Sequence, residues 1–372
     1  MKHALPLHIL NPMRYLVVPS QDTEAWKEYL ITNEWLERGY NIQIEKNERA
    51  IPLSNLFPDE LPTELKKFRL IEKNVPIPAP NDYLGYLKQK IGEEIFEKFK
   101  KYWPQSFDQI GEIIIIKIPT EIEKFSHDIG SALLNQNPKM SRVFHDLGVQ
   151  GEFRVRKLEL ISGNKDLGGE TKIKENGGEF IIDISKGYFS PRLATERFET
   201  LNSAKLLKNK LGRSLKICDA YAGFGPALVT LLNEKGLVNY ILANDLNPEV
   251  TKILNQNLIN CSKENVQFEV QCIDARKLVK FSKNKGNYDL LLVNLPHSTL
   301  EHLPQLIGLL NENNPSLLRA WCIIQSNEIE EVKNKLFELF TNLKKSITKI
   351  SVNPTRSYSP TQIYAKIEVW LN

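Results

Sequence analysis

The sequence predicts an α/β fold with a doubly wound, mostly parallel sheet in its C-terminal half. From Leu215 onward, short apolar runs alternate with helical patterns, the order that builds parallel strands with helices on both faces. The first strand, Leu215–Cys218, ends in Asp219 and a glycine turn, Gly223-Phe224-Gly225, after which Pro226 opens a helix. Proline in the first helical turn and glycine beyond the last turn are the expected ends of such a helix.

The glycine turn predicts a nucleotide site of the βα type. Glycines let the backbone approach a ligand closely, and the helix N-terminus offers free N–H groups. Asp245 follows the second strand, twenty residues after Gly225, at the spacing from which a carboxylate reaches a ribose hydroxyl. Asp219 is unsuited to a pyrophosphate but suits a cationic amino group, so it favours S-adenosylmethionine over a dinucleotide. A plain βα turn with a solvated aspartate is the alternative.

The polar residues of this half fall at the carboxyl ends of the expected strands, where such sheets bind their ligands. Asp219, Asp245, Asp274 and Asn294-Leu295-Pro296 should therefore ring one cleft. Asn294 can donate and accept hydrogen bonds at the edge of a planar base. The elements expected after the glycine turn are helix Pro226–Lys235, strand Tyr240–Ala243, helix Pro248–Asn260, strands Val266–Cys272 and Leu290–Val293, helix Leu300–Leu310, strand Ala320–Gln325, helix Glu328–Leu343 and strands Ser346–Val352 and Ile363–Leu371.

The N-terminal half is expected to form two smaller α/β units, residues 1–75 and 81–197, ahead of a catalytic domain over residues 198–372. A proline-rich linker, Val75–Pro80, should separate the first two. The elements expected in the first unit are strand Arg14–Pro19, helix Thr23–Arg38 and strands Ile42–Ile44 and Ala50–Leu53.

The second unit is expected to begin with one helix, Tyr83–Tyr102, and one buried strand, Ile110–Ile118, followed by a helix capped by Thr120. Its further strands are Arg142–Asp146, Phe153–Ile161, Lys172–Lys174 and Phe180–Ile184, the last two joined by a turn at Asn176-Gly177-Gly178. Strand alternation places Arg154 and Arg156 on one face. Thr195 is expected to cap a helix over Phe198–Leu211, with Glu196 in its first turn, where a carboxylate offsets the helix dipole.

Composition is that of an ordinary globular protein, with 372 residues, 41% hydrophobic and 25% charged. No apolar run reaches the length of a membrane span, and the N-terminus lacks a signal-peptide pattern, so we expect a cytoplasmic protein without a membrane segment. The four cysteines form no CxxC pair, which argues against a zinc site. A net charge of +4 permits a nucleic-acid partner, and no obligate protein partner is evident.

In several segments the sequence resembles the tRNA (guanine-N1)-methyltransferases of archaea and eukaryotes, which act on the guanosine at tRNA position 37. The segments, in chain order, are GEFRVRKLELISG, YFSPRLATER, DAYAGFGP, NDLNP and VNLP, and the resemblance covers about residues 83–372. It implies a class I (Rossmann-like) methyltransferase domain preceded by an α/β RNA-binding domain, with S-adenosylmethionine as cofactor. The implied partner is tRNA, held at its anticodon loop by the enzyme and at its elbow by residues 1–75.

The resemblance also implies roles for single residues. Glu196 would act as general base toward guanine N1, Arg154 would stabilise the charge that builds on O6, and Tyr188 would stack on the target base. Asn294 would act in catalysis and cofactor binding, and Pro296 would contact the base. The cofactor-binding set is Asp219, Ala222, Gly223, Gly225, Asp245, Leu246, Asp274, Ala275 and Asn294. Tyr221 and Phe224 depart from the usual glycine motif, and His297 has no assignable role.

Other activities stay open at this point. A sister family with the same architecture transfers the aminocarboxypropyl group of S-adenosylmethionine to a wyosine precursor at the same tRNA position. Leu193-Ala194-Thr195 before Glu196 and the Asn294-Leu295-Pro296 segment fit the methyltransferases better. A second methylation, at carbon-7 of a wyosine precursor, is also compatible with the sequence. An NAD-dependent dehydrogenase would leave Asp219 and Asn294 unexplained, and a non-catalytic RNA-binding protein would not need the carboxylates that are in place.

Overall fold

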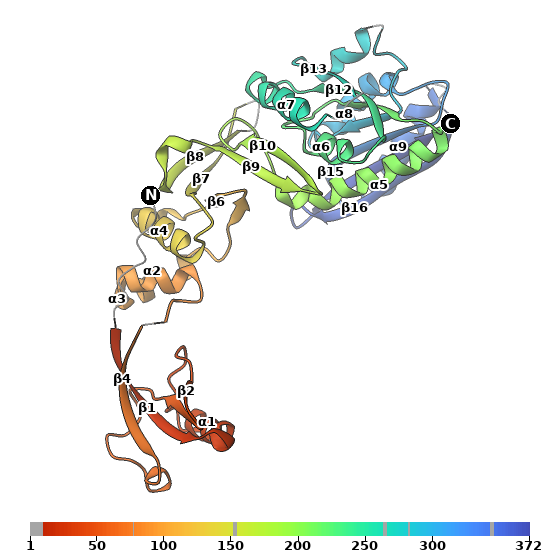
Figure 1. Ribbon diagram of the computed structural model, residues 1–372. Coiled ribbons are helices and arrows are strands. Elements are labelled where there is room, and N and C mark those ends of the chain that lie inside the picture. Colours follow the sequence, from red (N-terminus) through yellow and green to blue (C-terminus); the bar gives the residue numbers. More distant parts are fainter. Residues whose placement is uncertain (1–9, 77, 152–154, 263–265, 282, 343–345) are drawn as a thin grey trace. The chain divides into compact units, whose positions relative to one another are not determined.

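The computed structural model describes residues 10–76, 78–151, 155–262, 266–281, 283–342 and 346–372 (Figure 1). The chain divides into two compact units, Met1–Tyr86 and Leu87–Asn372. The expected further boundary between residues 197 and 198 lies inside the second unit and stays a prediction. Among the described residues, none of the helices is both long and apolar enough to cross a bilayer.

The first unit is an antiparallel sheet with one helix against it. Its strands are arranged in the order β2-β3-β1-β4, with β1 at Leu10–Pro19, β2 at Gln43–Glu45, β3 at Glu48–Pro52, β4 at Arg69–Pro76 and helix α1 at Thr23–Thr32. The helix predicted to continue to Arg38 ends earlier, because Glu34 adopts a left-handed conformation (φ 61°). Val75 and Pro76, predicted as linker, end β4, which pairs with β1; proline is tolerated there because β4 is an edge strand.

Short helices and two small sheets follow, of which the first helix, α2, begins within the first unit and ends in the second. The helices are α2 (Tyr83–Ile91), α3 (Glu93–Lys98) and α4 (Ser126–Gln136), and the strands are β5 (Asp108–Ile110), β6 (Ile113–Ile116), β7 (Arg142–Gln150), β8 (Val155–Gly163), β9 (Glu170–Glu175) and β10 (Gly178–Asp183). Strands β5 to β8 form one sheet in chain order, and β9 and β10 form a hairpin. The Asn176-Gly177 turn is confirmed, since Glu175 pairs with Gly178 and both turn residues have positive φ.

Three expectations for this region are wrong, for reasons of backbone conformation. The long helix breaks at Gly92, whose φ of 86° is outside the helical range. The single strand Ile110–Ile118 is a β5–β6 hairpin that reverses at Gly111 (φ 57°), where a Cβ would lie 2.3 Å from Thr171 Oγ1. Thr120 begins a 3-10 turn, Thr120–Phe125, and its side chain caps no helix. Residues 153 and 154 of the predicted strand Phe153–Ile161 lie outside the described residues.

The doubly wound sheet predicted for the C-terminal half is confirmed (Figure 1). Its strand order is β13-β12-β11-β14-β15-β17-β16, parallel from β13 to β15 and antiparallel thereafter. The strands are β11 (Leu215–Asp219), β12 (Val238–Asn244), β13 (Gln267–Gln271), β14 (Leu290–Val293), β15 (Ser316–Gln325), β16 (Ile347–Ser357) and β17 (Gln362–Leu371). Strand order reverses between β11 and β14, which is the switch point where such sheets bind ligands.

Helices cover both faces of this sheet. Leu207 of α5, Leu228 of α6 and Leu254 of α7 pack on one face, and Leu303 of α8 and Leu336 of α9 pack on the other. The helices are α5 (Ala194–Leu211), α6 (Pro226–Leu232), α7 (Pro248–Cys261), α8 (Thr299–Leu306) and α9 (Ile329–Asn342). All five aliphatic side chains are almost completely buried, so they form the two apolar layers that hold the strand ends in place.

The β9–β10 hairpin is tied to this sheet by polar contacts. The buried Asn257 amide of α7 accepts a hydrogen bond from the Ile181 N–H and donates one to the Ile181 carbonyl, each at 2.8 Å. Glu175 of β9 forms a buried ion pair with Arg197 of α5. The hairpin is therefore bound at two places to helices that cover the sheet, namely α7 and α5.

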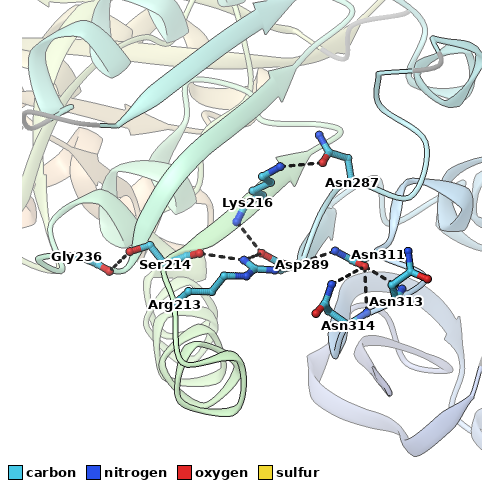
Figure 2. Close-up of polar contacts among 9 residues, drawn as sticks. All are labelled: Arg213, Ser214, Lys216, Gly236, Asn287, Asp289, Asn311, Asn313 and Asn314. Atoms are coloured by element: carbon cyan, nitrogen blue, oxygen red, sulfur yellow. Dashed lines mark hydrogen bonds and ion pairs between the residues drawn. The ribbon is translucent and has the colours of Figure 1, made fainter.

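A buried aspartate joins two strands and the end of α5 by polar contacts (Figure 2). It lies just before the start of β14, whereas the cleft is predicted at the carboxyl ends of the strands. Asp289 precedes β14 and is fully buried. Its carboxylate accepts two hydrogen bonds from the Arg213 guanidinium, at 2.7 and 2.8 Å, and one from the Lys216 N–H at 2.9 Å. Arg213 follows α5 and Lys216 belongs to β11, so one carboxylate fixes the helix end and both strands.

Candidate active site

A cavity of about 350 Å³ lies at the predicted switch point. A smaller hollow of about 50 Å³ shares Asn294 with it and is lined by Glu196, Asp219 and two residues that the sequence did not indicate, Trp321 and Tyr364. The predicted site residues that line the main cavity are Tyr188, Ala222, Gly223, Asp245, Leu246, Asp274, Ala275 and Asn294. The structure thus brings most of the predicted set together around two adjoining spaces.

Three predicted residues are not placed at these spaces. Arg154 lies outside the described residues. Gly225 lines neither space; with φ 82° it precedes α6, and a Cβ there would lie 2.7 Å from Leu254 Cδ1, so it allows α6 to approach α7. Pro296 also lines neither space, and its carbonyl accepts a hydrogen bond from the Ile323 N–H at 2.9 Å. The roles of all three residues stay predictions.

The glycine turn is held in shape by Asp245. One carboxylate oxygen accepts a hydrogen bond from the Gly223 N–H at 2.9 Å, and the other accepts one from the Asn247 N–H at 3.0 Å. Gly223 has a φ of 55°, which a side chain would disfavour. A carboxylate offers about four acceptor positions, so Asp245 retains acceptor capacity for the ribose hydroxyl that the sequence predicts.

Asp219 is the most deeply buried carboxylate of the site. It is 3% exposed and accepts a hydrogen bond from the Tyr221 N–H at 3.3 Å. Burial, together with the smaller effect of the nearby Asp245 charge, raises the pKa of Asp219 to about 7, although the hydrogen bond from the Tyr221 N–H opposes this shift. Burial likewise raises the pKa of Asp245. A cationic group between them would favour both ionised forms, which is the behaviour expected of a site for an ammonium or sulfonium ligand.

Affinity for S-adenosylmethionine is expected to rise, by up to about tenfold, as the pH increases from about 5.5 to 7.5. Asp219 is largely neutral below a pKa of about 7 and becomes an anion above it, so it attracts the cationic ligand only at the higher pH. The folding stability of the ligand-free protein has the opposite pH dependence, because the fold favours the protonated form of Asp219. This contribution to stability is complete below about pH 4 and is lost as the pH rises through 7. Calorimetric titration across this range measures the affinity.

Two controls accompany this measurement. Asp219→Asn cannot ionise and should flatten the pH dependence, and adenosine, which lacks the amino-acid portion, should bind the wild-type protein almost equally at both ends of the range. An unchanged slope in Asp219→Asn would contradict the assignment of Asp219 to the cationic end of the ligand.

The cations that line the main cavity are already paired. Arg276 donates to the Asp274 carboxylate at 2.8 Å, and this hydrogen bond lowers the pKa of Asp274. Arg197 pairs with Glu175. No lysine of the described residues lines this cavity. The donor set therefore fits a nucleoside with a cationic substituent and without phosphate, as S-adenosylmethionine is.

Glu196 and Asn294 are both oriented by the antiparallel strands β15 and β17. Trp321 Nε1 donates a hydrogen bond to Glu196 Oε2 at 3.0 Å, and Tyr364 Oη donates one to Asn294 Oδ1 at 3.0 Å. Glu196 lies in the first turn of α5, as predicted. The capping role predicted for Thr195 is wrong, because a 3-10 turn at Pro191–Leu193 leads directly into α5 at Ala194 and places Thr195 inside the helix.

The mouth of the main cavity carries an exposed aromatic side chain. Tyr188 is 50% exposed, and the Arg156 guanidinium carbon lies 5.8 Å from the centre of its ring. Arg156 also pairs with Asp108 and Asp146. An exposed ring beside a cation is a suitable stacking surface for a nucleic-acid base.

His297, for which the sequence predicts no role, has its Nε2 atom 3.4 Å from Tyr358 Oη.

Sequence reasoning missed Trp321, Tyr364 and the pair formed by Tyr221 and His302. Tyr221 Oη lies 2.6 Å from His302 Nδ1, and both residues line the main cavity. Trp321 and Tyr364 are buried in strands whose pattern indicates only a core, so no local signal distinguishes them. For Tyr221, its place in the glycine motif was the available signal.

A doubly wound sheet with a switch-point cavity, a glycine turn held by one aspartate and a second buried aspartate define a class I S-adenosylmethionine-dependent methyltransferase. The comparisons with known proteins agree. Residues 171–330 match the TRM5/TYW2 methyltransferase domain, and residues 86–166 match the TYW2 N-terminal domain.

The chain is similar to Trm5 proteins over most of its length. It is 30% identical to the tRNA (guanine(37)-N(1))-methyltransferase Trm5b of Pyrococcus abyssi over 298 residues, which are 79% of this chain and 80% of that protein. The crystal structure of that Trm5b superposes with a TM-score of 0.67 at 26% identity, covering 96% of this chain and 99% of the other. The complex of aTrm5 with tRNALeu shares the fold, with a TM-score of 0.68 at 24% identity and the same coverage. This chain belongs to the Trm5 family of tRNA (guanine(37)-N1)-methyltransferases.

Proposed function

We propose that this enzyme transfers a methyl group from S-adenosylmethionine to N1 of guanosine at tRNA position 37. One observation carries the proposal: a carboxylate, Glu196, and an amide, Asn294, share a hollow that adjoins the cofactor cavity. The relative from P. abyssi bears this activity in its name, and aTrm5 was solved with tRNALeu, which supports tRNA as the partner. We extend the proposal to contacts with the anticodon loop and, through the first unit, with the elbow.

The residues of the chain have separate tasks in this reaction. Guanine N1 carries a proton at neutral pH, so it becomes nucleophilic only when that proton leaves, and Glu196 is the acceptor. Negative charge then develops on O6. The Asn294 Nδ2 donor can meet it, because Tyr364 occupies Oδ1 of the same amide. Arg154, whose role rests on the sequence, would add a cation there. When bound, S-adenosylmethionine supplies an electrophilic methyl group on its sulfonium.

Binding and orientation carry the remainder of the rate. Asp245 and the Gly223 turn hold the ribose end of the cofactor, and Asp219 holds its cationic end. Tyr188, at the mouth of the cavity, stacks on the target base once the base leaves the anticodon loop. The product thioether is neutral and needs no proton, so alignment of N1 with the methyl group is the main requirement after deprotonation.

The test is mass spectrometry of nucleosides from tRNA treated with the enzyme and S-adenosylmethionine. We expect 1-methylguanosine from a guanosine-37 transcript. An inosine-37 transcript keeps N1–H and O6 and should be methylated, whereas an adenosine-37 transcript lacks both and should not be. Methylation of the adenosine transcript at the same rate would contradict deprotonation at N1.

The same experiment addresses the alternative, aminocarboxypropyl transfer to a wyosine precursor. The matching domain description names TYW2 beside TRM5, which is the observation that keeps this activity in view. An enzyme with this activity would add the mass of an aminocarboxypropyl group to tRNA that carries the wyosine precursor at position 37, and it would leave an unmodified guanosine 37 unchanged. Methylation at carbon-7 of a wyosine precursor would appear as a second methyl product on that tRNA only.

A further inference from the structure

The first turns of α5 rest on one polar face of the β15–β17 strand pair. Residues directly opposite each other in antiparallel strands project to the same side, and Trp321 pairs with Lys366 while Ile323 pairs with Tyr364. On this side Lys366 contacts Glu199 of α5 through an ion pair. Trp321, Tyr364 and Leu193 form a buried cluster beneath the helix start. The strand pair thus sets where the first residues of α5 lie.

A second polar group anchors the same helix one turn further on. Arg319 is 1% exposed and donates to Glu199 O, while Ser203 of α5 donates to the Glu368 carboxylate at 2.9 Å. Arg319 also pairs with Glu368, its neighbour across the strands. Because the helix backbone is already fixed by these contacts, the Trp321 hydrogen bond is not needed to dock α5. Its remaining effect is on the Glu196 carboxylate itself.

We propose that Trp321 is a positioning residue for Glu196, and that it directs the carboxylate toward the substrate. Its indole N–H is a single, rigid donor on a ring that is 5% exposed, so it can bind Oε2 in one orientation only. The other oxygen, Oε1, is then presented for the guanine proton. Tyr364, which lies opposite Ile323 on the neighbouring strand, does the same for Asn294, because its hydroxyl donates a hydrogen bond to Oδ1 at 3.0 Å. This inference rests on the proposed role of Glu196.

Trp321→Phe keeps an aromatic ring in the cluster and removes the N–H. We expect its single-turnover rate, at saturating tRNA and S-adenosylmethionine, to fall about tenfold to 100-fold, the scale of a misplaced catalytic group. Cofactor affinity should stay within about twofold of wild type, since Trp321 does not line the main cavity and its Nε1 donates to Glu196, not to Asp219 or Asp245, the carboxylates assigned to the cofactor. Trp370→Phe is the matched control: Trp370 is buried in β17 against Lys210 and should keep the wild-type rate.

A double-mutant cycle separates positioning from folding. If Trp321 acts through Glu196, then Trp321→Phe should change the rate of Glu196→Gln by no more than about twofold, because the group that it positions is already inactive. An equal loss in both backgrounds would show a merely structural role. Benzothienylalanine at position 321 has the shape of tryptophan without the N–H, and it replaces Trp321→Phe if that variant unfolds.

The outcomes distinguish this inference from the proposed function. A wild-type rate in Trp321→Phe or in the benzothienylalanine protein, with a strong loss in Glu196→Gln, overturns the positioning role and leaves the base intact. A wild-type rate in Glu196→Gln overturns the base and the positioning role with it. Loss in Trp321→Phe that vanishes in the Glu196→Gln background supports both.

Discussion

Glu196→Gln is expected to slow the methyl-transfer step by about 10²–10⁴-fold, the range typical of a lost general base. Glutamine has the shape of glutamate but cannot take the proton from guanine N1. It still offers an amide oxygen to Trp321 Nε1, so the hydrogen bond that orients the side chain can persist. Single-turnover kinetics with a guanosine-37 transcript measure the step without interference from product release.

Thermal unfolding supplies the control for this variant. If Glu196 served only to offset the dipole of α5, its loss would change stability by about 0.3–1 kcal/mol and leave the chemistry intact. We expect cofactor affinity and tRNA affinity close to wild type, with the loss confined to the rate. Methyl transfer at the wild-type single-turnover rate would remove Glu196 from the mechanism.

Asp245→Ala is expected to weaken S-adenosylmethionine binding by about 1–3 kcal/mol, or about fivefold to 150-fold. The substitution removes the acceptor that we assign to the ribose hydroxyls, and it also frees the Gly223 N–H that shapes the turn. Both effects act on the same ligand, so the loss should appear as a higher dissociation constant in calorimetry. Unchanged affinity would exclude Asp245 from the cofactor site.

A general loss of stability must be separated from this local effect. Asp289→Asn is the matched variant, because it removes a buried carboxylate whose contacts are drawn in Figure 2. Asp289 precedes β14 and Asn294 follows it, so the two residues lie at opposite ends of the same strand. It should cost about 1–3 kcal/mol of folding stability through its bonds to Arg213 and Lys216. At a temperature where both variants are folded, only Asp245→Ala should lose cofactor affinity.

The sheet and most of the residues that line its two hollows were predictable, because their signals are local. The Asp219 strand end, the glycine turn and the Asp245 strand end each follow from strand and helix patterns within a few residues. Parallel alternation then places their carboxyl ends at one edge. The Asn176-Gly177 hairpin is predictable for the same reason, since the turn itself dictates the pairing.

The predictions that failed, and the site residues that were missed, depend on backbone conformations or long-range contacts that a local sequence pattern does not contain. Gly92 and Gly111 have positive φ and interrupt segments whose residue patterns predict one continuous helix and one continuous strand. Trp321 meets Glu196 across 125 residues of sequence, and Tyr364 meets Asn294 across 70. Such pairs form only when the sheet folds. The periodicity of the strands therefore predicts that these aromatic residues are buried, but it does not predict the partners of their polar atoms.

The contacts of Asn257 and Arg197 bear on how this protein can be divided experimentally. A fragment that starts at residue 198 would lack Ile181, and the Asn257 amide, 1% exposed in the whole chain, would lose both of its hydrogen bonds to that residue. A fragment that starts before β9 at Glu170 keeps those bonds and the Glu175–Arg197 pair as well. A fragment designed around the methyltransferase sheet should therefore include the β9–β10 hairpin, although in sequence the hairpin precedes the strands of that sheet.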